Sequence, residues 1–524
     1  VGSYNNAMGY LSLYAGTSGN YNNAFGQYAL CANTTGSNNV AIGSSTLKSN
    51  TTGPDNVAIG ANALKSNTTG TYNNAIGYAL CSNTEGNYNN AMGYQAMYSN
   101  TTGCYNNAMG YGALYCNTTG KCNTSFGYQS MYYGVSGCDN FGAGYRSLHC
   151  NNGSHNTAIG YRALCVNDTG NHNVAFGCGA LQSNTTGNAN FAALNSALGS
   201  TTTGGCNVGI GSCAMASNTT GTSNVGIGLK AGYLNTTGCN NTAIGQQALQ
   251  NNITGSCNIS LGFESLCGSL SGSNNFAVGY RSLRNNWGGC HNNGIGVNAL
   301  LSNTTGCHNT GIGQYALCGN TTGDQNFAVG VEALRNNTTG TSNQAVGCLA
   351  LNNNTTGGNN TAIGYFSLLS NTTGSYNAAI GASALQGSLS GSHNFGAGYR
   401  ALYSNWGGCC NAAIGYHALY CNTTGIRNNA IGPYALKENT TGNYNQAIGY
   451  YAMACNTTGI DNVAIGHSAL LSNTTADNNI AIGKQALCKS TTGCYNTAIG
   501  CGVLYYNTTG THNAAIGRSA LYCN

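Results

Sequence analysis

A glycine recurs about every 17 residues along almost the whole chain, and this spacing limits the possible folds more than any other feature. A unit of this length is too short for a repeat of two packed helices, which needs about 33 residues or more, and for a leucine-rich repeat, which needs about 20 to 29. It is the length of one coil of a β-solenoid, so the 524 residues predict about 31 coils. Leu194 interrupts the glycine row, whose members include Gly9, Gly26, Gly43, Gly60, Gly77, Gly93, Gly110, Gly127, Gly483, Gly500 and Gly517.

Each repeated unit combines strand-length segments with turn chemistry. The consensus N-N-A-I-G-Y-x-A-L-x-x-N-T-T-G-x-Y is nearly complete in residues 107–120 and 360–374. The segments A-I-G-Y and x-A-L-x have the length of short strands, whereas the Asn and Gly of N-T-T-G favour tight or left-handed backbone. We therefore expect two short strands and two corners per coil. With 80 Gly, two Pro and 5% charged residues, the composition is uniform and predicts an all-β fold, one continuous β-solenoid domain over residues 1–524.

A size exchange between two positions predicts which side chains face the core. Where the residue two positions before the Ile is Phe, the Ile is replaced by Ala or Val. Residues i and i+2 of a strand lie on one face, and a narrow core would force such an exchange. We therefore expect these two positions to point inward, with the intervening Ala and the repeated Gly outward and the later Leu, as in Leu64, Leu114 and Leu419, inward. The exchanged pairs are Phe141 and Ala143, Phe191 and Ala193, Phe276 and Val278, Phe327 and Val329, and Phe395 and Ala397.

Two segments of the unit resemble known repeat families. The motif N-x-A-I-G, present in residues 56–60 and 462–466, resembles the head repeats of trimeric autotransporter adhesins. The longer unit, which runs through N-T-T-G, is similar to the repeats of phage tail-fibre-like proteins and marine microbial surface proteins. These resemblances cover nearly the whole chain and imply a β-solenoid fold.

The N-T-T-G turn contains a row of candidate N-glycosylation acceptors. An Asn-x-Thr acceptor recurs at this turn in about 20 coils, and such acceptors are used in exposed turns of secreted chains. We expect covalent N-glycans here; the alternative is that Asn and Thr build the turn and stack in hydrogen-bonded ladders. The acceptors are Asn33, Asn50, Asn67, Asn100, Asn117, Asn167, Asn184, Asn218, Asn235, Asn252, Asn303, Asn320, Asn337, Asn354, Asn371, Asn422, Asn439, Asn456, Asn473 and Asn507.

The 26 cysteines predict an oxidising, extracellular location, because disulfides persist mainly in secreted proteins. Most of them flank the N-T-T-G turn, where a bond could bridge one turn or join neighbouring coils. Competing pairs leave the connectivity open. The candidate pairs are Cys116 with Cys122, Cys488 with Cys494, and Cys290 with Cys307; the competing pairs are Cys104 with Cys122 and Cys239 with Cys257.

No catalytic, cofactor-binding or metal-binding constellation is predicted. The nine His and ten acidic residues are scattered without a repeated nucleophile or carboxylate companion, and no Cys pair recurs with zinc-site spacing. No apolar stretch approaches the roughly 18 residues of a membrane span, and a net charge of +5 provides no nucleic-acid footprint. The Tyr after each core Gly, as in Tyr94 and Tyr111, is expected to stack along the solenoid, with sugar binding as the alternative.

A second-order repeat predicts lateral contact patches. In four places G-x-S-G or G-S-L-S-G replaces N-T-T-G; three of these are followed by F-x-x-G-Y-R, and two of those coils then carry N-W-G-G. These changes remove the glycan acceptor and introduce Arg and Trp, which are enriched at interface hot spots. The residues expected to contact a neighbouring protofilament or a bound partner are Arg146, Arg281, Trp287, Arg400 and Trp406.

Together these features predict a structural subunit of a secreted, extracellular filament. Neither end of the sequence has a recognisable cap, and the last residues followed by the first would complete a coil of about 16 residues. We therefore expect the chain to polymerise head to tail with copies of itself. The alternatives are an adhesin or receptor-binding fibre shaft, and an ice- or glycan-binding solenoid that uses Thr rows such as Thr101 and Thr118. The expected end-to-end contacts are Val1, Tyr4, Leu521, Cys523 and Asn524.

Overall fold

The computed structural model describes residues 2–523, and these residues form an all-β protein without a helix. It contains 31 strands of three residues each, spaced about 17 residues apart, which form a β-solenoid of about 30 turns. The predicted fold class is therefore confirmed.

The strands are β1 (Asn6–Met8), β2 (Asn23–Phe25), β3 (Val40–Ile42), β4 (Val57–Ile59), β5 (Asn74–Ile76), β6 (Asn90–Met92), β7 (Asn107–Met109), β8 (Thr124–Phe126), β9 (Phe141–Ala143), β10 (Thr157–Ile159), β11 (Val174–Phe176), β12 (Phe191–Ala193), β13 (Val208–Ile210), β14 (Val225–Ile227), β15 (Thr242–Ile244), β16 (Ile259–Leu261), β17 (Phe276–Val278), β18 (Asn293–Ile295), β19 (Thr310–Ile312), β20 (Phe327–Val329), β21 (Gln344–Val346), β22 (Thr361–Ile363), β23 (Ala378–Ile380), β24 (Phe395–Ala397), β25 (Ala412–Ile414), β26 (Asn429–Ile431), β27 (Gln446–Ile448), β28 (Val463–Ile465), β29 (Ile480–Ile482), β30 (Thr497–Ile499) and β31 (Ala514–Ile516).

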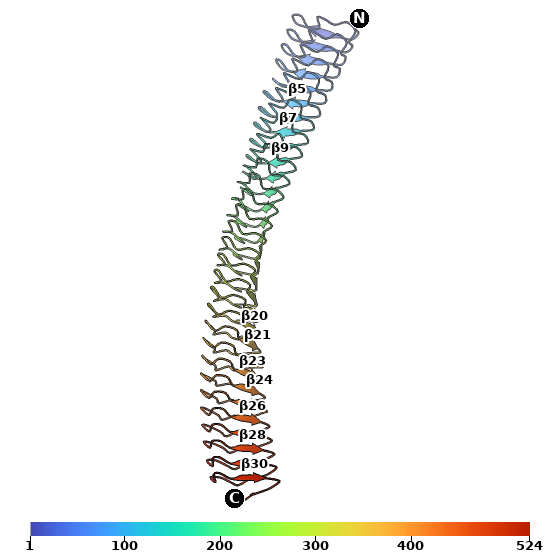
Figure 1. Cartoon of the computed structure of the whole chain (residues 1–524). Helices are drawn as coiled ribbons and strands as arrows, with labels where there is room; N and C mark the ends of the chain where they lie inside the picture. Colours follow the sequence, from blue (N-terminus) through green and yellow to red (C-terminus); the bar gives the residue numbers. More distant parts are fainter. Residues whose placement is uncertain (1, 524) are drawn as a thin grey trace. The chain divides into compact units, whose positions relative to one another are not determined.

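The chain divides into two compact units with the same coil architecture. The first ends at Asn258 and carries β1–β15, and the second begins at Ile259 and carries β16–β31. Within each unit, consecutive strands pair in parallel and in register, as Ala41 does with Ala58 and Ala464 with Ala481. Figure 1 shows the strands of each unit stacked one coil after another. Each residue therefore lies beside its equivalent in the next coil.

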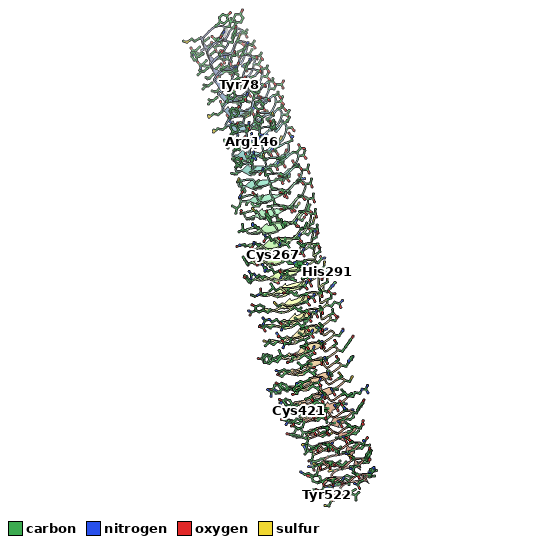
Figure 2. All side chains as sticks on the ribbon, turned by 90° about the vertical axis from the view of Figure 1, so that its left-hand side faces the viewer. Tyr78, Arg146, Cys267, His291, Cys421 and Tyr522 are labelled. Atoms are coloured by element: carbon green, nitrogen blue, oxygen red, sulfur yellow. The ribbon has the colours of Figure 1, made fainter. Side chains whose placement is uncertain are left out.

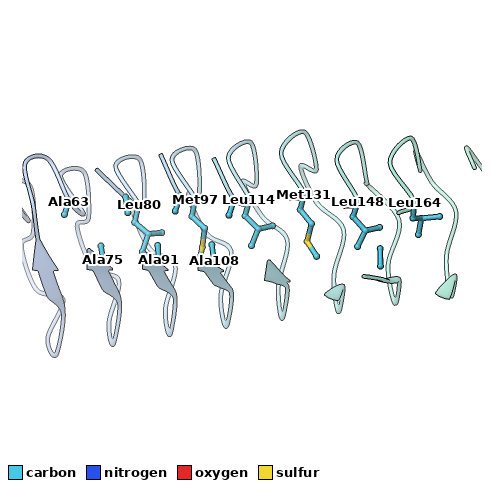
Figure 3. Packing of buried hydrophobic residues seen from close by; sticks show 14 of the residues in the cluster. Ala63, Ala75, Leu80, Ala91, Met97, Ala108, Leu114, Met131, Leu148 and Leu164 are labelled. Atoms are coloured by element: carbon cyan, nitrogen blue, oxygen red, sulfur yellow. The ribbon is translucent and has the colours of Figure 1, made fainter. Parts of the chain in front are cut away.

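The apolar core of each coil is narrow and is built mainly from three side chains, one from the strand and two from the following segment, such as Ala63 and Leu64. In β2–β31 the middle residue of the strand is buried, and in almost every coil a Leu or Met from the following segment faces it. In Figure 3, Ala75 and Ala91 lie across the core from Leu80 and Met97, and all four side chains are buried. The prediction that the recurring Leu points inward is confirmed, because Leu64, Leu114 and Leu419 are buried.

The predicted inward face of the strand is wrong. Ile42 is 40% exposed and Val40 is half-buried, whereas Ala41 between them is fully buried. Side chains alternate along a strand, so a shift of one residue moves the whole set to the other face. The gap to the opposite Leu holds only Ala, Gly or Ser at the middle position, and the exchange between Phe141 and Ala143 therefore takes place on the outer face.

The predicted second strand is also wrong, although its segment does pair with the neighbouring coils. Asn62 and Leu64 adopt left-handed φ values of 63° and 50°, which non-glycine residues rarely do. The amide of Leu64 nevertheless donates a hydrogen bond to the carbonyl of Ala79, one coil away, at 3.2 Å. The alternation of left-handed residues bends the segment around the core, so each coil has one strand instead of two.

The glycine row has two structural causes. Gly43 has a φ of 132°, a backbone conformation that disfavours other residues, and a Cβ there would lie 2.8 Å from the carbonyl carbon of Gly60 in the next coil. The spacing of the coils therefore leaves no room for a side chain at this corner. Leu194 occupies the equivalent corner with a φ of 82° and an exposed side chain.

Candidate interaction surfaces

The turn Asn row, predicted to carry glycans, is buried inside the coil. Asn50 donates from Nδ2 to Oδ1 of Asn33 at 2.8 Å and to the carbonyl of Gly53 at 3.0 Å. N-linked glycans are attached through this same nitrogen, and all 20 predicted acceptor side chains are at most 2% exposed. The prediction of an exposed acceptor row is therefore wrong in the folded solenoid. The alternative, a stacked hydrogen-bonded ladder, describes the turn.

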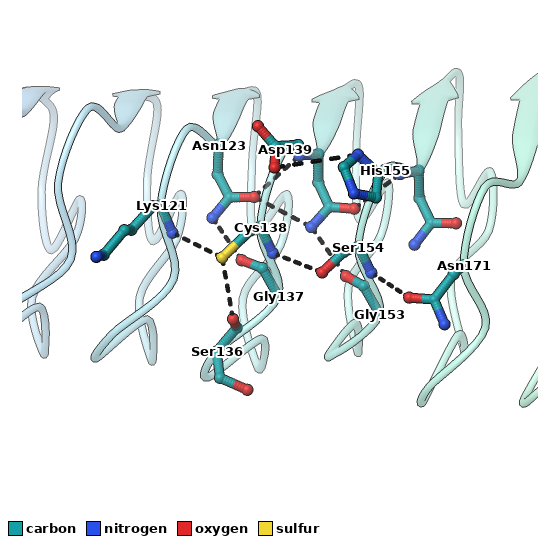
Figure 4. Close-up of polar contacts among 12 residues, drawn as sticks. Lys121, Asn123, Ser136, Gly137, Cys138, Asp139, Gly153, Ser154, His155 and Asn171 are labelled. Atoms are coloured by element: carbon teal, nitrogen blue, oxygen red, sulfur yellow. Dashed lines mark hydrogen bonds and ion pairs between the residues drawn. The ribbon is translucent and has the colours of Figure 1, made fainter.

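A second buried Asn row, not identified from the sequence, precedes the strands. Asn39 donates from its backbone amide and from Nδ2 to Oδ1 of Asn22, and its Nδ2 also donates to the carbonyl of Gly53. Figure 4 shows the same arrangement in a later coil, where Nδ2 of Asn123 donates to the carbonyl of Gly137. The recurrence of Asn at this position was the available signal. This row joins the strand to the turn and joins each coil to its neighbour.

The two Thr of the turn differ in exposure. Thr101 donates from Oγ1 to the carbonyl of Thr118, one coil away, at 3.1 Å, so its hydroxyl belongs to the backbone ladder. The following residues, Thr102 and Thr119, are exposed. The hydroxyl row that faces solvent is therefore formed by the second Thr of each turn, whereas the sequence analysis expected it to be formed by the first.

None of the predicted disulfides is formed: each of the 26 cysteines is a free thiol in the structure. Cys290 and Cys307 do occupy equivalent places in successive coils, but the backbone amide of Cys290 donates to Sγ of Cys307 at 3.2 Å. Cys494 likewise accepts from the amide of Asp477 at 3.3 Å. Cys116 is partly buried and Cys488 is buried, and burial raises the pKa of both thiols. Cys122 lies on the exposed surface.

A hydrogen-bond row explains the cysteines that directly follow the turn. Sγ of Cys138 accepts from the amide of Lys121, Oγ of Ser154 accepts from the amide of Cys138, and Oδ1 of Asn171 accepts from the amide of Ser154, at 3.4, 3.0 and 2.7 Å. Figure 4 shows this succession. A thiol, a hydroxyl and an amide oxygen are interchangeable here because each accepts one backbone N–H.

Aromatic side chains stack along the solenoid, as expected for the Tyr after each core Gly. The rings of Tyr94 and Tyr111 are stacked with centroids 5.5 Å apart, and those of Tyr111 and Tyr128 are 5.1 Å apart. A hydrogen bond to Tyr98 and burial raise the pKa of Tyr78 to about 12. Figure 2 shows Tyr78 among the side chains that project from the first unit.

The predicted lateral contact residues fall into two groups. The Arg side chains interact within their own unit: Arg281 pairs with Glu264 at 2.8 Å, and Arg146 donates from Nε to Oε1 of Gln129 at 3.0 Å. The guanidinium of Arg400 lies over two aromatic rings at 5.1 and 5.4 Å from their centroids. Both Trp rings are open to solvent, with Trp287 56% and Trp406 57% exposed.

The expected end-to-end residues are described in part. Tyr4 is exposed and stacks on Tyr21 with ring centroids 4.8 Å apart. Leu521 and Cys523 are exposed. Val1 and Asn524 lie outside the described residues.

The outward side of the strands forms an apolar surface that the sequence analysis assigned to the core. A hollow of about 350 Å³ lies on it over β5–β8, lined by Asn74, Ile76, Met92, Met109 and Phe126 among others. Within residues 2–523, no group of three or more His, Cys, Asp or Glu side chains lies close enough together to hold a metal ion. The described residues also include no helix able to cross a membrane.

No protein-family model matches the sequence, and no curated protein is similar to it.

Proposed function

We propose that the protein is a structural subunit of an extracellular filament. The observation that carries this proposal is the repetition of one hydrogen-bond set from coil to coil: two buried Asn rows and a Thr row link neighbouring coils in both units. Asn50 with Asn33 in the first unit and Asn439 with Asn422 in the second are linked in the same way, each at 2.8 Å. Polar groups that could bind a substrate are thereby used for stacking, which suits a load-carrying solenoid.

Head-to-tail growth is the finer part of this proposal. A shortened coil of 16 residues, such as the one between Gly77 and Gly93, is one form that a junction between two copies would take. Coils of this length keep their register within the first unit: Ala75 pairs with Ala91 on the strands before Gly77 and Gly93, 16 residues apart. A shortened coil is therefore compatible with continued parallel pairing.

A second candidate is recognition of an ordered surface by the exposed Thr row. Thr102 and Thr119 occupy equivalent places in successive coils, so their hydroxyls recur at about the 4.8 Å strand spacing. A regular hydroxyl array suits ice or a polymeric glycan. Clear thermal hysteresis that is lost when several of these Thr are replaced by Lys would favour this candidate over the filament.

Electron microscopy of the purified protein tests the filament proposal. We expect filaments many subunits long that keep the strand spacing of the solenoid along their axis. Fractionation of the source cells should recover the protein in the extracellular fraction. Particles that never exceed one subunit in length, at any protein concentration, would contradict the proposal.

A further inference from the structure

The outward side of the strands carries a continuous apolar row in both units. We define the outer strand face as the first and third residues of the strands. The third residue is Met, Phe, Ile, Leu, Val or Ala in all 31 strands, and it points outward, as in Ile59 and Ile159. None of the 15 basic or ten acidic residues lies in a strand. Contiguous apolar surfaces of this kind mark sites of association.

The size exchange between first and third residues lies on this same face. Phe141 on β9 is accompanied by Ala143, and the Phe141 ring contacts Phe126 on β8 with centroids 6.2 Å apart. The ring thereby covers the space that an Ile at the third position would fill. Water molecules fill the gaps between side chains of any size, whereas the packed side chains of a second protein surface do not. The exchange pairs a large first residue with a small third residue, as tight contact with a second surface would favour.

Five of the Asn side chains on the face are hydrogen-bonded to one another, in the groups Asn6–Asn23 and Asn74–Asn90–Asn107. Nδ2 of Asn74 donates to Oδ1 of Asn90 at 2.7 Å, and Nδ2 of Asn90 donates to Oδ1 of Asn107 at 2.9 Å. A polar group that keeps its partner is much less costly to remove from water than an unpaired one. The face can therefore be covered without burying a charged side chain, and the amides of the Asn74–Asn90–Asn107 row keep partners when it is covered.

We infer that the outer strand face packs against the same face of a second copy of this chain, sheet against sheet. An isologous pair requires that the same face of both copies be self-complementary. Each strand of three residues offers about 10 Å by 4.8 Å, so the 15 strands of the first unit offer about 700 Å² per partner. The total of about 1,400 Å² lies within the range of stable interfaces. This pairing is lateral and does not depend on head-to-tail growth.

Matched lysine variants of the full chain test the pairing. The face variant carries Lys at four third positions, two in each unit, which are 38–42% exposed. The control variant carries Lys at four apolar turn residues that are 40–46% exposed. Charged residues occupy the equivalent turn positions in other coils, as Glu438, Lys489 and Asp168 show. The face substitutions are Ile59→Lys, Ile159→Lys, Ile363→Lys and Ile414→Lys, and the control substitutions are Val166→Lys, Ile253→Lys, Leu270→Lys and Leu389→Lys.

For the native protein and the control variant, light scattering should give pairs of the 53.4 kDa chain, or, in a filament, two chains side by side along each solenoid length. The face variant should dissociate, with its self-association weakened at least about 100-fold, because each Lys would be buried unpaired. Circular dichroism checks that both variants fold. Single chains in the native protein, assemblies of three laterally associated chains, or equal association of both variants would overturn the inference.

Methionine oxidation reports which face is covered. Met92 and Met109 lie on the outer strand face, whereas Met97 and Met131 are buried in the core and serve as internal controls. With dilute peroxide, we expect Met92 and Met109 to oxidise at least about tenfold more slowly in the native protein than in the face variant. Growth from end to end alone would leave these two rates unchanged, so equal rates would overturn the lateral pairing and leave the filament proposal standing.

Discussion

Asn50 donates an amide hydrogen bond from Nδ2 to the side-chain oxygen of Asn33, one coil away, at 2.8 Å, and both side chains are buried. Oδ1 of Asn50 in turn accepts from Nδ2 of Asn67 at 2.8 Å. The turn residues that resemble glycan acceptors are thus the members of an internal amide ladder. Its strength and its gaps can be measured.

Replacing one ladder member should destabilise the first unit. Asn50→Ala removes the donor to Oδ1 of Asn33 and the acceptor for Nδ2 of Asn67, both of which are buried, so we expect a loss of at least about 2 kcal/mol. The exposed neighbour provides the control, and Thr52→Ala should change stability by no more than about 0.5 kcal/mol. Chemical denaturation followed by circular dichroism measures both; similar shifts of the midpoint would contradict the ladder.

Completing the ladder where it is interrupted should stabilise the second unit. Ser490 stands where the turn Asn is expected, and neither its Oγ nor Oδ1 of Asn473 has a hydrogen-bond partner among the described residues. Ser490→Asn supplies the missing donor and should raise stability by about 1–2 kcal/mol. The matched change Thr492→Asn, in the same turn but exposed, should have almost no effect. An unchanged or lowered melting temperature for Ser490→Asn would show that the turn cannot accommodate the amide.

Folded protein from a glycosylating secretory host should carry no N-glycan at the turn Asn row. A sugar on Nδ2 of Asn50 would replace a hydrogen bond inside the coil and would have no space, because the side chain is fully buried. Mass spectrometry before and after endoglycosidase treatment measures the modification, with a secreted glycoprotein from the same cells as the positive control. A loss of mass that maps to these Asn in folded protein would contradict the structure.

Core and outer positions of the same coil should respond differently to truncation. Leu64 is fully buried, and Leu64→Ala should cost about 2–4 kcal/mol through the cavity that it leaves. Ile59 lies on the outer strand face, and Ile59→Ala should cost less than about 1 kcal/mol in the folding of a single chain. Denaturation at a concentration where the chains are dissociated separates folding from association. A larger effect at Ile59 would restore the inward orientation that the sequence suggested.

The thiol of Cys81 should be unusually slow to react. Burial raises its pKa to about 11 from an ordinary value of about 9. The unfolded chain loses this proton at a lower pH than the folded chain, so the contribution to stability is present below about pH 9 and is lost as the pH rises toward 11. Alkylation of Cys81 by iodoacetamide, mapped by mass spectrometry between pH 8 and 11, should accelerate only near pH 11 in folded protein. In denaturant, alkylation of the same thiol should accelerate at a pH about two units lower. The same pH dependence in folded and denatured protein would contradict the raised pKa of Cys81.

The sequence alone predicted the coil, its length and the stacking of equivalent residues, since a repeat of about 17 residues allows few other folds. The glycine row carried this information because Gly43 and its equivalents combine a left-handed φ with close approach of the next coil. The inward Leu was also evident from its recurrence, as Leu64 and Leu419 illustrate.

Only the tertiary structure decided which face of the strand is covered and where the turn Asn points. Ala41 and Ile42 are both apolar, so the usual alternation of apolar and polar residues could not distinguish the two faces. The narrow gap opposite Leu47 admits Ala41 and excludes Ile42, a limit of size that depends on the distance across the coil. In the same way, Asn50 is buried because its amide meets Asn33 of the neighbouring coil, a contact that exists only once the coils are stacked.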